Sequence, residues 1–142
     1  MVKTVKSITI KAPVEKVFDY ISEPTNLPEI WPSVVEIKDV QKLPSGSNRN
    51  RWVYKMAGIR LEGTSENEYV PNQRIVTKTK GGVESTITWM FQPEAGGTKV
   101  TFGGEYTVPI PVLGKLAEAI IVKMNEHEAE LILANLKVRM EV

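Results

Sequence analysis

Residues 112–142 read VLGKLAEAIIVKMNEHEAELILANLKVRMEV. This stretch contains no Pro, its only Gly is at position 114, and it is rich in Leu, Ala, Glu, Lys and Met. These residues lose little rotamer freedom in a helix. At about 100° per residue, one face of such a helix carries Leu116, Ile120, Met124, His127 and Leu131. The sequence therefore predicts a long amphipathic helix from about Val112 to Met140, which needs an apolar surface to pack against.

The rest of the chain consists mostly of short segments in which apolar and polar residues alternate. Such alternation is typical of strands with one buried face. We expect seven strands, at residues 3–11, 34–43, 50–56, 59–69, 74–80, 83–92 and 98–107. Short turns such as Gly81-Gly82 separate successive strands, which favours antiparallel hairpins. After the first strand, Pro13 begins a short helix, and a segment interrupted by prolines follows and carries Trp31.

The two faces of these strands differ in chemistry, because one is charged or rich in Thr and the other is apolar and aromatic. One side of the sheet is therefore expected to face water and the other to face the helix. Seven twisted strands curl strongly, and a curled sheet around one helix buries both apolar surfaces. We predict an α+β fold. It has a curved seven-stranded antiparallel sheet around the long C-terminal helix, with a short helical segment between strands 1 and 2. A single domain over residues 1–142 is expected from the length.

The composition excludes several classes of function. The net charge is +1 and charged residues make up 25% of the chain, so no nucleic-acid partner is expected. The absence of Cys excludes disulfides and thiolate metal sites, and the single His excludes a two-His metal motif. We therefore expect no metal and no cofactor. No segment approaches 18 apolar residues, and the N-terminus alternates like a strand. These features predict a cytoplasmic monomer without integral membrane association.

Three segments carry a resemblance to a known family. They are ITIKAPVEKVFDYISEPTNLPEIWPSVVEI, GIRLEGTSENEYVPNQRIV and WMFQPEAGGTKVTFGGEYTVP. With them, the chain resembles the START/Bet v 1-like (SRPBCC) helix-grip superfamily, in its polyketide cyclase/dehydrase and lipid-transport branch. The resemblance covers essentially the whole chain and implies the helix-grip fold. Members bind lipids, sterols, polyketides, quinones or plant hormones, some are cyclases, and others act through protein contacts. No catalytic residue is shared by all branches, so the resemblance implies none here.

The side chains expected to point inward have two interpretations, as core or as the wall of a ligand cavity. A dry pocket of about 300 Å³ would cost about 7 kcal/mol, comparable with the whole stability of a domain. The many bulky aromatic residues therefore predict a small or partly filled cavity. The candidate ligand-binding residues are Trp31, Trp52, Tyr54, Met56, Leu61, Trp89, Phe91, Phe102, Tyr106, Leu116, Ile120, Met124, His127 and Leu131.

Three functions remain open at this point. The first is binding of a hydrophobic or amphipathic small molecule, such as a lipid, polyketide or quinone, between sheet and helix. The second is a cyclase or dehydratase that uses His127 or a Tyr as acid–base group. The third is a protein-interaction module. His127 itself is a core histidine, a polar anchor for a ligand, or a general base, and in each case it is expected to point toward the sheet.

Overall fold

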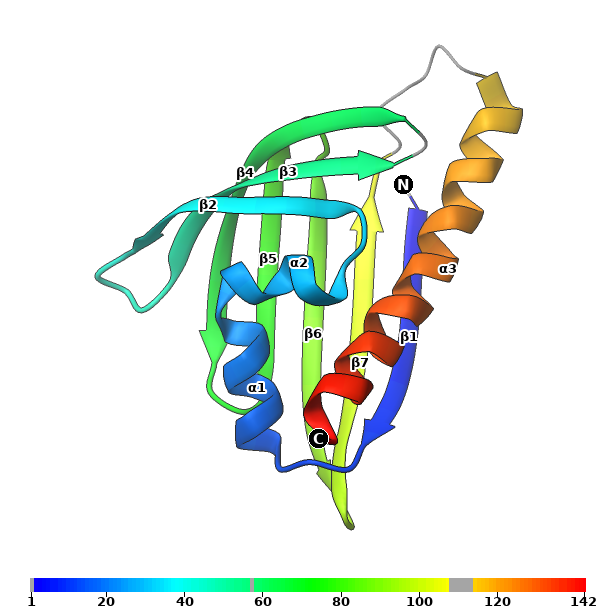
Figure 1. The fold of residues 1–142 in the computed structure, drawn as a ribbon. Coiled ribbons are helices and arrows are strands. Elements are labelled where there is room, and N and C mark those ends of the chain that lie inside the picture. Colours follow the sequence, from blue (N-terminus) through cyan, green and yellow to red (C-terminus); the bar gives the residue numbers. More distant parts are fainter. Residues whose placement is uncertain (1, 57, 108–113) are drawn as a thin grey trace.

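A curved antiparallel sheet and one long helix dominate the structure (Figure 1). The computed structural model describes residues 2–56, 58–107 and 114–142. The elements in chain order are β1 (Val2–Ile10), α1 (Val14–Ser22), the 3-10 helix η1 (Pro24–Asn26), α2 (Leu27–Ile30), β2 (Val34–Lys42), β3 (Asn48–Met56), β4 (Ile59–Val70), β5 (Arg74–Gly81), β6 (Ser85–Glu94), β7 (Gly97–Tyr106) and α3 (Gly114–Met140). The predicted helix-grip arrangement is confirmed. The predicted start of the long helix at Val112 lies outside the described residues.

The strands form one sheet in the order β1-β7-β6-β5-β4-β3-β2, and every neighbouring pair is antiparallel. Strands β2 to β7 follow one another as hairpins, whereas β1 pairs with β7, so that Ile10 lies opposite Thr98. The alternation read from the sequence holds, since Trp52, Trp89 and Phe102 are buried on the inner face. The sheet curls so that β2 and β3 bend over the concave side (Figure 1).

Helix α1 and the proline-rich segment cover one end of the concave face. Pro13 precedes α1 and cannot donate a backbone hydrogen bond, which is harmless at a helix start. Val17, Phe18 and Ile21 form the buried face of α1. Pro24 and Pro28 each stand in the first turn of η1 and α2. These short elements hold the chain close to α3 before it enters β2 (Figure 1).

The apolar core occupies the end of the sheet where α1 meets the C-terminal half of α3. Ile132 and Leu136 of α3 are completely or almost completely buried there. Phe18 of α1 packs edge-to-face on Phe91 of β6, with ring centroids 5.4 Å apart. The closely packed part of the molecule therefore lies at one end of the sheet, and the other end is free to form a cavity.

Helix α3 presents a different face to the sheet from the one predicted. Its buried residues are Glu128, Ala129, Ile132, Leu133, Leu136 and Met140. The predicted inward residues Leu116, Ile120, Met124, His127 and Leu131 are exposed. Apolar residues occur on both faces, so periodicity alone does not identify the buried one. The face with Ile132, Leu133 and Leu136 is the more apolar over the C-terminal half, which is where the helix contacts the core.

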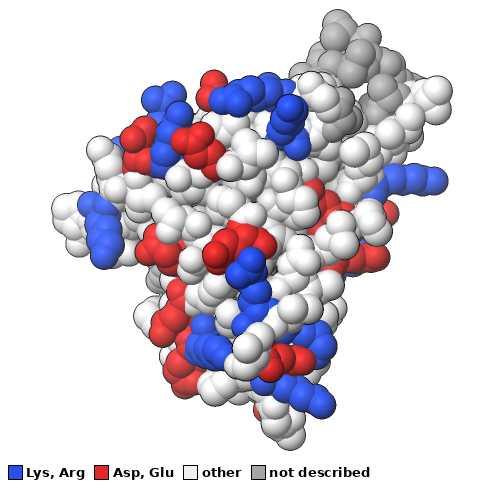
Figure 2. Space-filling view, in the orientation of Figure 1, with Lys and Arg blue, Asp and Glu red and all other residues white. Residues whose placement is uncertain are grey.

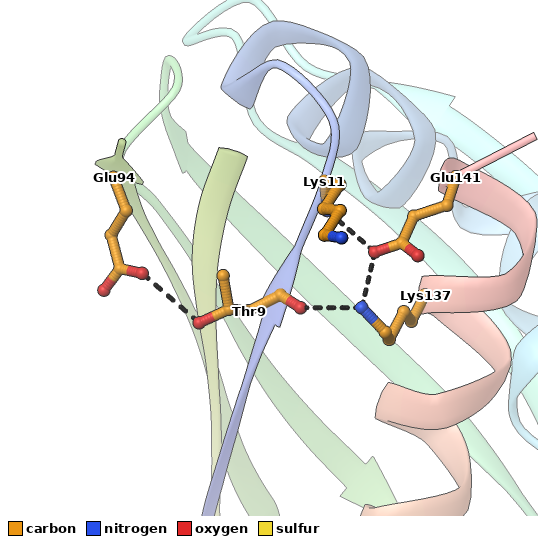
Figure 3. A network of polar contacts seen from close by, with 5 residues as sticks. All are labelled: Thr9, Lys11, Glu94, Lys137 and Glu141. Atoms are coloured by element: carbon orange, nitrogen blue, oxygen red, sulfur yellow. Dashed lines mark hydrogen bonds and ion pairs between the residues drawn. The ribbon is translucent and has the colours of Figure 1, made fainter. Parts of the chain in front are cut away.

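The C-terminal end of α3 is tied to the end of β1 by polar contacts (Figure 3). The Glu141 carboxylate accepts a hydrogen bond from the Lys11 backbone N–H at 2.8 Å and pairs with Lys137 at 2.5 Å. Lys137 also donates to the Thr9 carbonyl at 3.1 Å. The Lys11 N–H and the Lys137 ammonium hold the pKa of Glu141 below its ordinary value. These contacts join the first strand to the last helix.

Candidate functional site

A cavity of about 180 Å³ lies between the sheet and α3, at the opposite end from the core. Its wall comes from all seven strands, from the segment around α2, and from Ile121, Asn125, Glu128, Ala129 and Ile132 of α3. The volume is below the range of about 300–1,000 Å³ that is typical of ligand sites. This volume agrees with the prediction of a small cavity, because large aromatic side chains occupy much of the space under the sheet.

Aromatic rings form the apolar part of the cavity wall. Trp31 packs edge-to-face on Phe102, with centroids 5.5 Å apart, and Trp89 packs on the same ring at 4.9 Å. Trp52 is buried on β3, opposite Gly63 of β4. A Cβ atom on Gly63 would lie 2.4 Å from the Trp52 ring. A glycine at this position therefore makes room for the indole.

Polar side chains cross the inner face of the sheet in one row. In register from β3 to β7, this polar row consists of Asn50, Ser65, Thr79, Ser85 and Tyr106. All five residues line the cavity. The hydroxyls of Thr79 and Ser85 lie 2.6 Å apart and are hydrogen-bonded. The sheet side of the cavity is therefore polar over a continuous strip, which an ordinary apolar core would not require.

A second set of hydrogen bonds fixes the polar row from the side. The Asn67 amide donates to Asn50 Oδ1 at 2.9 Å and to Asn48 Oδ1 at 2.6 Å. Its carbonyl accepts a hydrogen bond from the Thr77 hydroxyl at 2.6 Å. Hydrogen-bonded networks of this kind hold their side chains in one arrangement. The part of the polar row around Asn50 is thus preorganised.

Glu128 of α3 is the buried acidic residue of the cavity wall, with 8% of its surface exposed. Its Oε1 accepts a hydrogen bond from Trp31 Nε1 at 2.8 Å, and its Oε2 accepts one from the Ser33 hydroxyl. The Tyr54 hydroxyl lies 3.4 Å from Glu128 Oε1 and 3.0 Å from Asn125 Oδ1. Burial raises the pKa of the Tyr54 phenol, and the negative charge of Glu128 adds to the increase. Tyr54 therefore remains a protonated donor.

Three other polar atoms of wall residues are buried without a hydrogen-bond partner among the described residues. They are Thr4 Oγ1, Trp52 Nε1 and Tyr106 Oη. An unpaired buried donor or acceptor costs about 1–3 kcal/mol. A hydrogen bond from a ligand or a water molecule to one of these groups would remove this cost. Burial also raises the pKa of Tyr106, so its hydroxyl keeps its proton and is available as a donor.

The structure brings together eight of the predicted site residues at the cavity. They are Trp31, Trp52, Tyr54, Met56, Leu61, Trp89, Phe102 and Tyr106. Phe91 lies instead in the core, against Phe18. Leu116, Ile120, Met124, His127 and Leu131 lie on the outer side of α3, for the reason given above.

His127 does not point toward the sheet, so the expected orientation and the interpretation as a core histidine are wrong. The side chain is exposed and borders a shallow depression together with Lys55, Met124 and Leu131. Glu128 and Met56 line both this depression and the cavity, so they form the wall between the two hollows. A role for His127 as general base toward a molecule in the cavity is therefore not supported by its position.

Of the polar row, Tyr106 was among the residues predicted for the site, whereas Asn50, Ser65, Thr79 and Ser85 were not, and neither was Glu128. A signal for the row exists, because the alternation of β3 extends backward from Trp52 to Asn50 and Asn48. The alternation of β4 likewise puts Ser65 and Asn67 on the same face as Leu61. For Glu128 no signal exists in the sequence, since a single acidic residue in a helix is usually exposed.

The outer surface shows no concentration of one charge on the face seen in Figure 2, where acidic and basic side chains are interleaved. Within the described ranges, no helix is long and apolar enough to cross a membrane. In the same part of the chain, no three His, Asp or Glu side chains are grouped so that they could hold a metal ion.

Several solved structures have an architecture similar to that of this chain. The chain resembles TTHA0849 from Thermus thermophilus (TM-score 0.79, 24% identity, covering 98% of this chain and 97% of that chain). It also resembles the Zhui aromatase/cyclase from Streptomyces sp. R1128 (TM-score 0.80, 17% identity, 99% and 93% covered). A START superfamily protein from Mycobacterium smegmatis is similar as well (TM-score 0.81, 17% identity, 98% and 97% covered). At these identities the likeness shows the fold alone.

No curated protein matches the sequence significantly. A family match is nevertheless clear, because residues 1–141 fit the family described as polyketide cyclase/dehydrase and lipid transport. This match spans nearly the whole chain of 142 residues. It shows that the chain belongs to the polyketide cyclase/dehydrase and lipid-transport family, and the START superfamily structure from Mycobacterium smegmatis has a similar fold.

Proposed function

We propose that the protein binds a hydrophobic or amphipathic small molecule in the cavity between the sheet and α3. The observation that supports this proposal is the two-sided character of the cavity. Aromatic rings from Trp31, Trp52 and Phe102 offer apolar contact, whereas the polar row offers hydrogen-bonding groups. Ligand sites combine these features, with apolar contact supplying most of the free energy and a few polar groups fixing orientation.

The energetics of the empty space support the same proposal. A dry void of 180 Å³ would destabilise the fold by about 4 kcal/mol at about 24 cal/mol per Å³. That is a large fraction of the roughly 5–15 kcal/mol that stabilises a typical domain. A packed core of the same size would close such a void, as the end of the sheet around Phe91 does. A ligand that occupies the cavity would remove this cost.

Acid–base catalysis has less support from the geometry. His127 lies outside the cavity, and the raised pKa of Tyr54 keeps its phenol protonated, so that it is not available as a base at neutral pH. The family and similar structures include aromatase/cyclases, so turnover of a bound polyketide remains the alternative function. The interaction-module alternative remains a prediction too, and the exposed apolar residues Leu116, Ile120 and Leu131 are where it is to be tested.

Two neighbouring residues of α3 give a matched test of the binding proposal. Ile121 lines the cavity, whereas Ile120 is 52% exposed on the outer side. Ile121→Trp is expected to fill the cavity and to weaken binding of an environment-sensitive apolar dye by about tenfold or more, equivalent to about 1.4 kcal/mol. Ile120→Trp adds the same indole to the outside and is expected to leave dye binding unchanged.

Dye fluorescence titration measures the affinities, and native mass spectrometry of the freshly purified protein detects a retained small molecule. Circular dichroism confirms that both variants are folded. Equal weakening by the two substitutions, or by neither in folded proteins, would show that the dye binds outside the cavity and would contradict the proposal.

A further inference from the structure

The charge of the cavity wall points to the chemistry of its ligand. Two wall residues are acidic, Glu105 and Glu128, and among the described wall residues none is Lys, Arg or His. Glu105 is half-exposed and pairs with Lys3 at 3.4 Å, so its charge is balanced at the surface. Glu128 is buried, and no ion pair involves it among the described residues. The cavity is therefore a site with one uncompensated negative charge.

The hydrogen bonds of Glu128 leave room for a further donor. A carboxylate has about four lone-pair sites. Trp31 Nε1 and the Ser33 hydroxyl occupy two of them, one on each oxygen. The Tyr54 hydroxyl has one proton, and its closer acceptor is Asn125 Oδ1, at 3.0 Å against 3.4 Å for Glu128. At least one acceptor site on Glu128 is thus free for a ligand.

Two basic residues lie on the other side of the wall that Glu128 helps to form. Lys55 and His127 border the outer depression, which Glu128 also lines, but neither is among the wall residues of the cavity. The aromatic side chains that contact Glu128 inside the cavity are Trp31, at 2.8 Å, and Tyr54, at 3.4 Å. Aromatic rings next to a carboxylate attract a cation or a hydrogen-bond donor and disfavour an anion.

From these observations we infer that the cavity selects ligands whose polar end is a hydrogen-bond donor, an ammonium or hydroxyl group, and rejects ligands that end in a carboxylate, with Glu128 as the specificity-determining residue. This inference rests on the proposed binding function and names the ligand class. A carboxylate head group would face Glu128 in a space of low dielectric without a counter-ion, and repulsion between like charges is strong there. An ammonium or hydroxyl group would donate to the free acceptor site of Glu128.

Three ligands with one ring system and different head groups test the inference. They are 2-naphthylmethylamine, 2-naphthalenemethanol and 2-naphthoic acid, measured by isothermal titration calorimetry at neutral pH and constant ionic strength. We expect the amine to bind about tenfold or more tightly than the acid, with the alcohol between them. Binding of the acid as tight as that of the amine would overturn the inference while leaving the binding proposal intact. Absence of binding by all three would contradict both.

Two substitutions on α3 test whether Glu128 causes the preference for the amine over the acid. Glu128→Gln keeps the size and an acceptor but removes the charge, and we expect the amine-to-acid preference to fall by about tenfold. Glu130→Gln removes a charge from the outer side of the same helix, where Glu130 pairs with Lys6 at 3.2 Å, and the preference is expected to stay the same. An unchanged preference in folded Glu128→Gln would overturn the role of Glu128. If this variant does not fold, the ranking of the three ligands by the wild-type protein still decides whether the cavity rejects carboxylates.

Discussion

The indole Nε1 of Trp31 donates a hydrogen bond to the carboxylate Oε1 of Glu128 at 2.8 Å. Trp31 directly follows α2, and Glu128 lies in the middle of α3. The bond therefore fastens the proline-rich segment to the long helix along one side of the cavity. It also satisfies two buried polar groups at once, which an apolar contact between the same elements would not do.

Replacing Trp31 with Phe tests this connection. The substitution keeps an aromatic ring near Phe102 but leaves Glu128 without one of its donors. We expect the free energy of unfolding to fall by about 1–3 kcal/mol, measured by urea denaturation. Tyr20→Phe is the control, since it removes an exposed hydrogen bond to Glu29 and should cost about 0.5 kcal/mol or less. An equal decrease in the free energy of unfolding in the two variants would mean that the bond to Glu128 stabilises the fold no more than an exposed hydrogen bond does.

Gly63 is expected to be intolerant of any side chain. A Cβ atom there would lie 2.1 Å from the Lys80 carbonyl oxygen and 2.4 Å from the Trp52 ring. Gly63→Ala should therefore destabilise the protein by about 2 kcal/mol or more, because the backbone of β5 cannot give way easily. Gly104→Ala is the matched control on the cavity wall, where a Cβ atom has no neighbour within 4 Å among the described residues. Thermal unfolding that is equally affected by both substitutions would contradict this explanation.

The contacts of Glu141 make part of the stability dependent on acid pH. Because its folded-state pKa is lowered, its ionised form stabilises the folded state. This contribution is fully present above the ordinary pKa of 4.5 and is lost as the pH falls through the folded-state value. Glu141→Gln should thus be less stable than the wild type at neutral pH, and the difference should shrink as the pH falls below 4.5. Urea midpoints across this range measure the effect. A difference that stays constant with pH would show that the charge is not involved.

The raised pKa of Tyr54 predicts that the stability of the protein falls as the pH rises in the alkaline range. Its folded-state pKa is raised, so the folded state holds the phenol proton more tightly than the unfolded chain does. The associated stability is present below the ordinary pKa of 10.0 and is lost as the pH rises above it. Tyr54→Phe should make the alkaline loss of stability smaller. Absorbance of the phenolate in the near ultraviolet follows the titration, and an identical alkaline profile in the variant would refute the assignment.

Much of the fold could be predicted because the strand pattern has a period of two. Trp52, Trp89 and Phe102 are each separated from the next inward residue by one residue of the opposite face, and a shift by one residue would reverse every side chain. This constraint fixes both the strand positions and the inner face. The order of β2 to β7 then follows from the short turns between them, whereas the pairing of β1 with β7 does not.

The face of α3 could not be predicted in the same way. Leu116, Ile120 and Leu131 form a helical stripe of about the same quality as Ile121, Ile132 and Leu136, which lie about 130° away at about 100° per residue. Which stripe is buried depends on the shape of the partner surface, which a single sequence does not contain. The error carried over to His127 and concealed Glu128, so the aromatic part of the site was predicted and the charged part was not.

The pairing of β1 with β7 has a consequence for folding during synthesis on the ribosome. Val2 lies opposite Tyr106, so β1 is made before every other strand of the sheet and is among the last to find its partner. Until β7 has emerged, the backbone groups of β1 have no neighbouring strand within the sheet, and the alternating apolar residues Ile8 and Ile10 remain uncovered. Closing so large a loop is slow compared with forming the successive hairpins. The nascent chain is therefore expected to assemble its hairpins from β2 onward and to add β1 last, which makes β1 the segment most exposed to chaperones and to aggregation during synthesis.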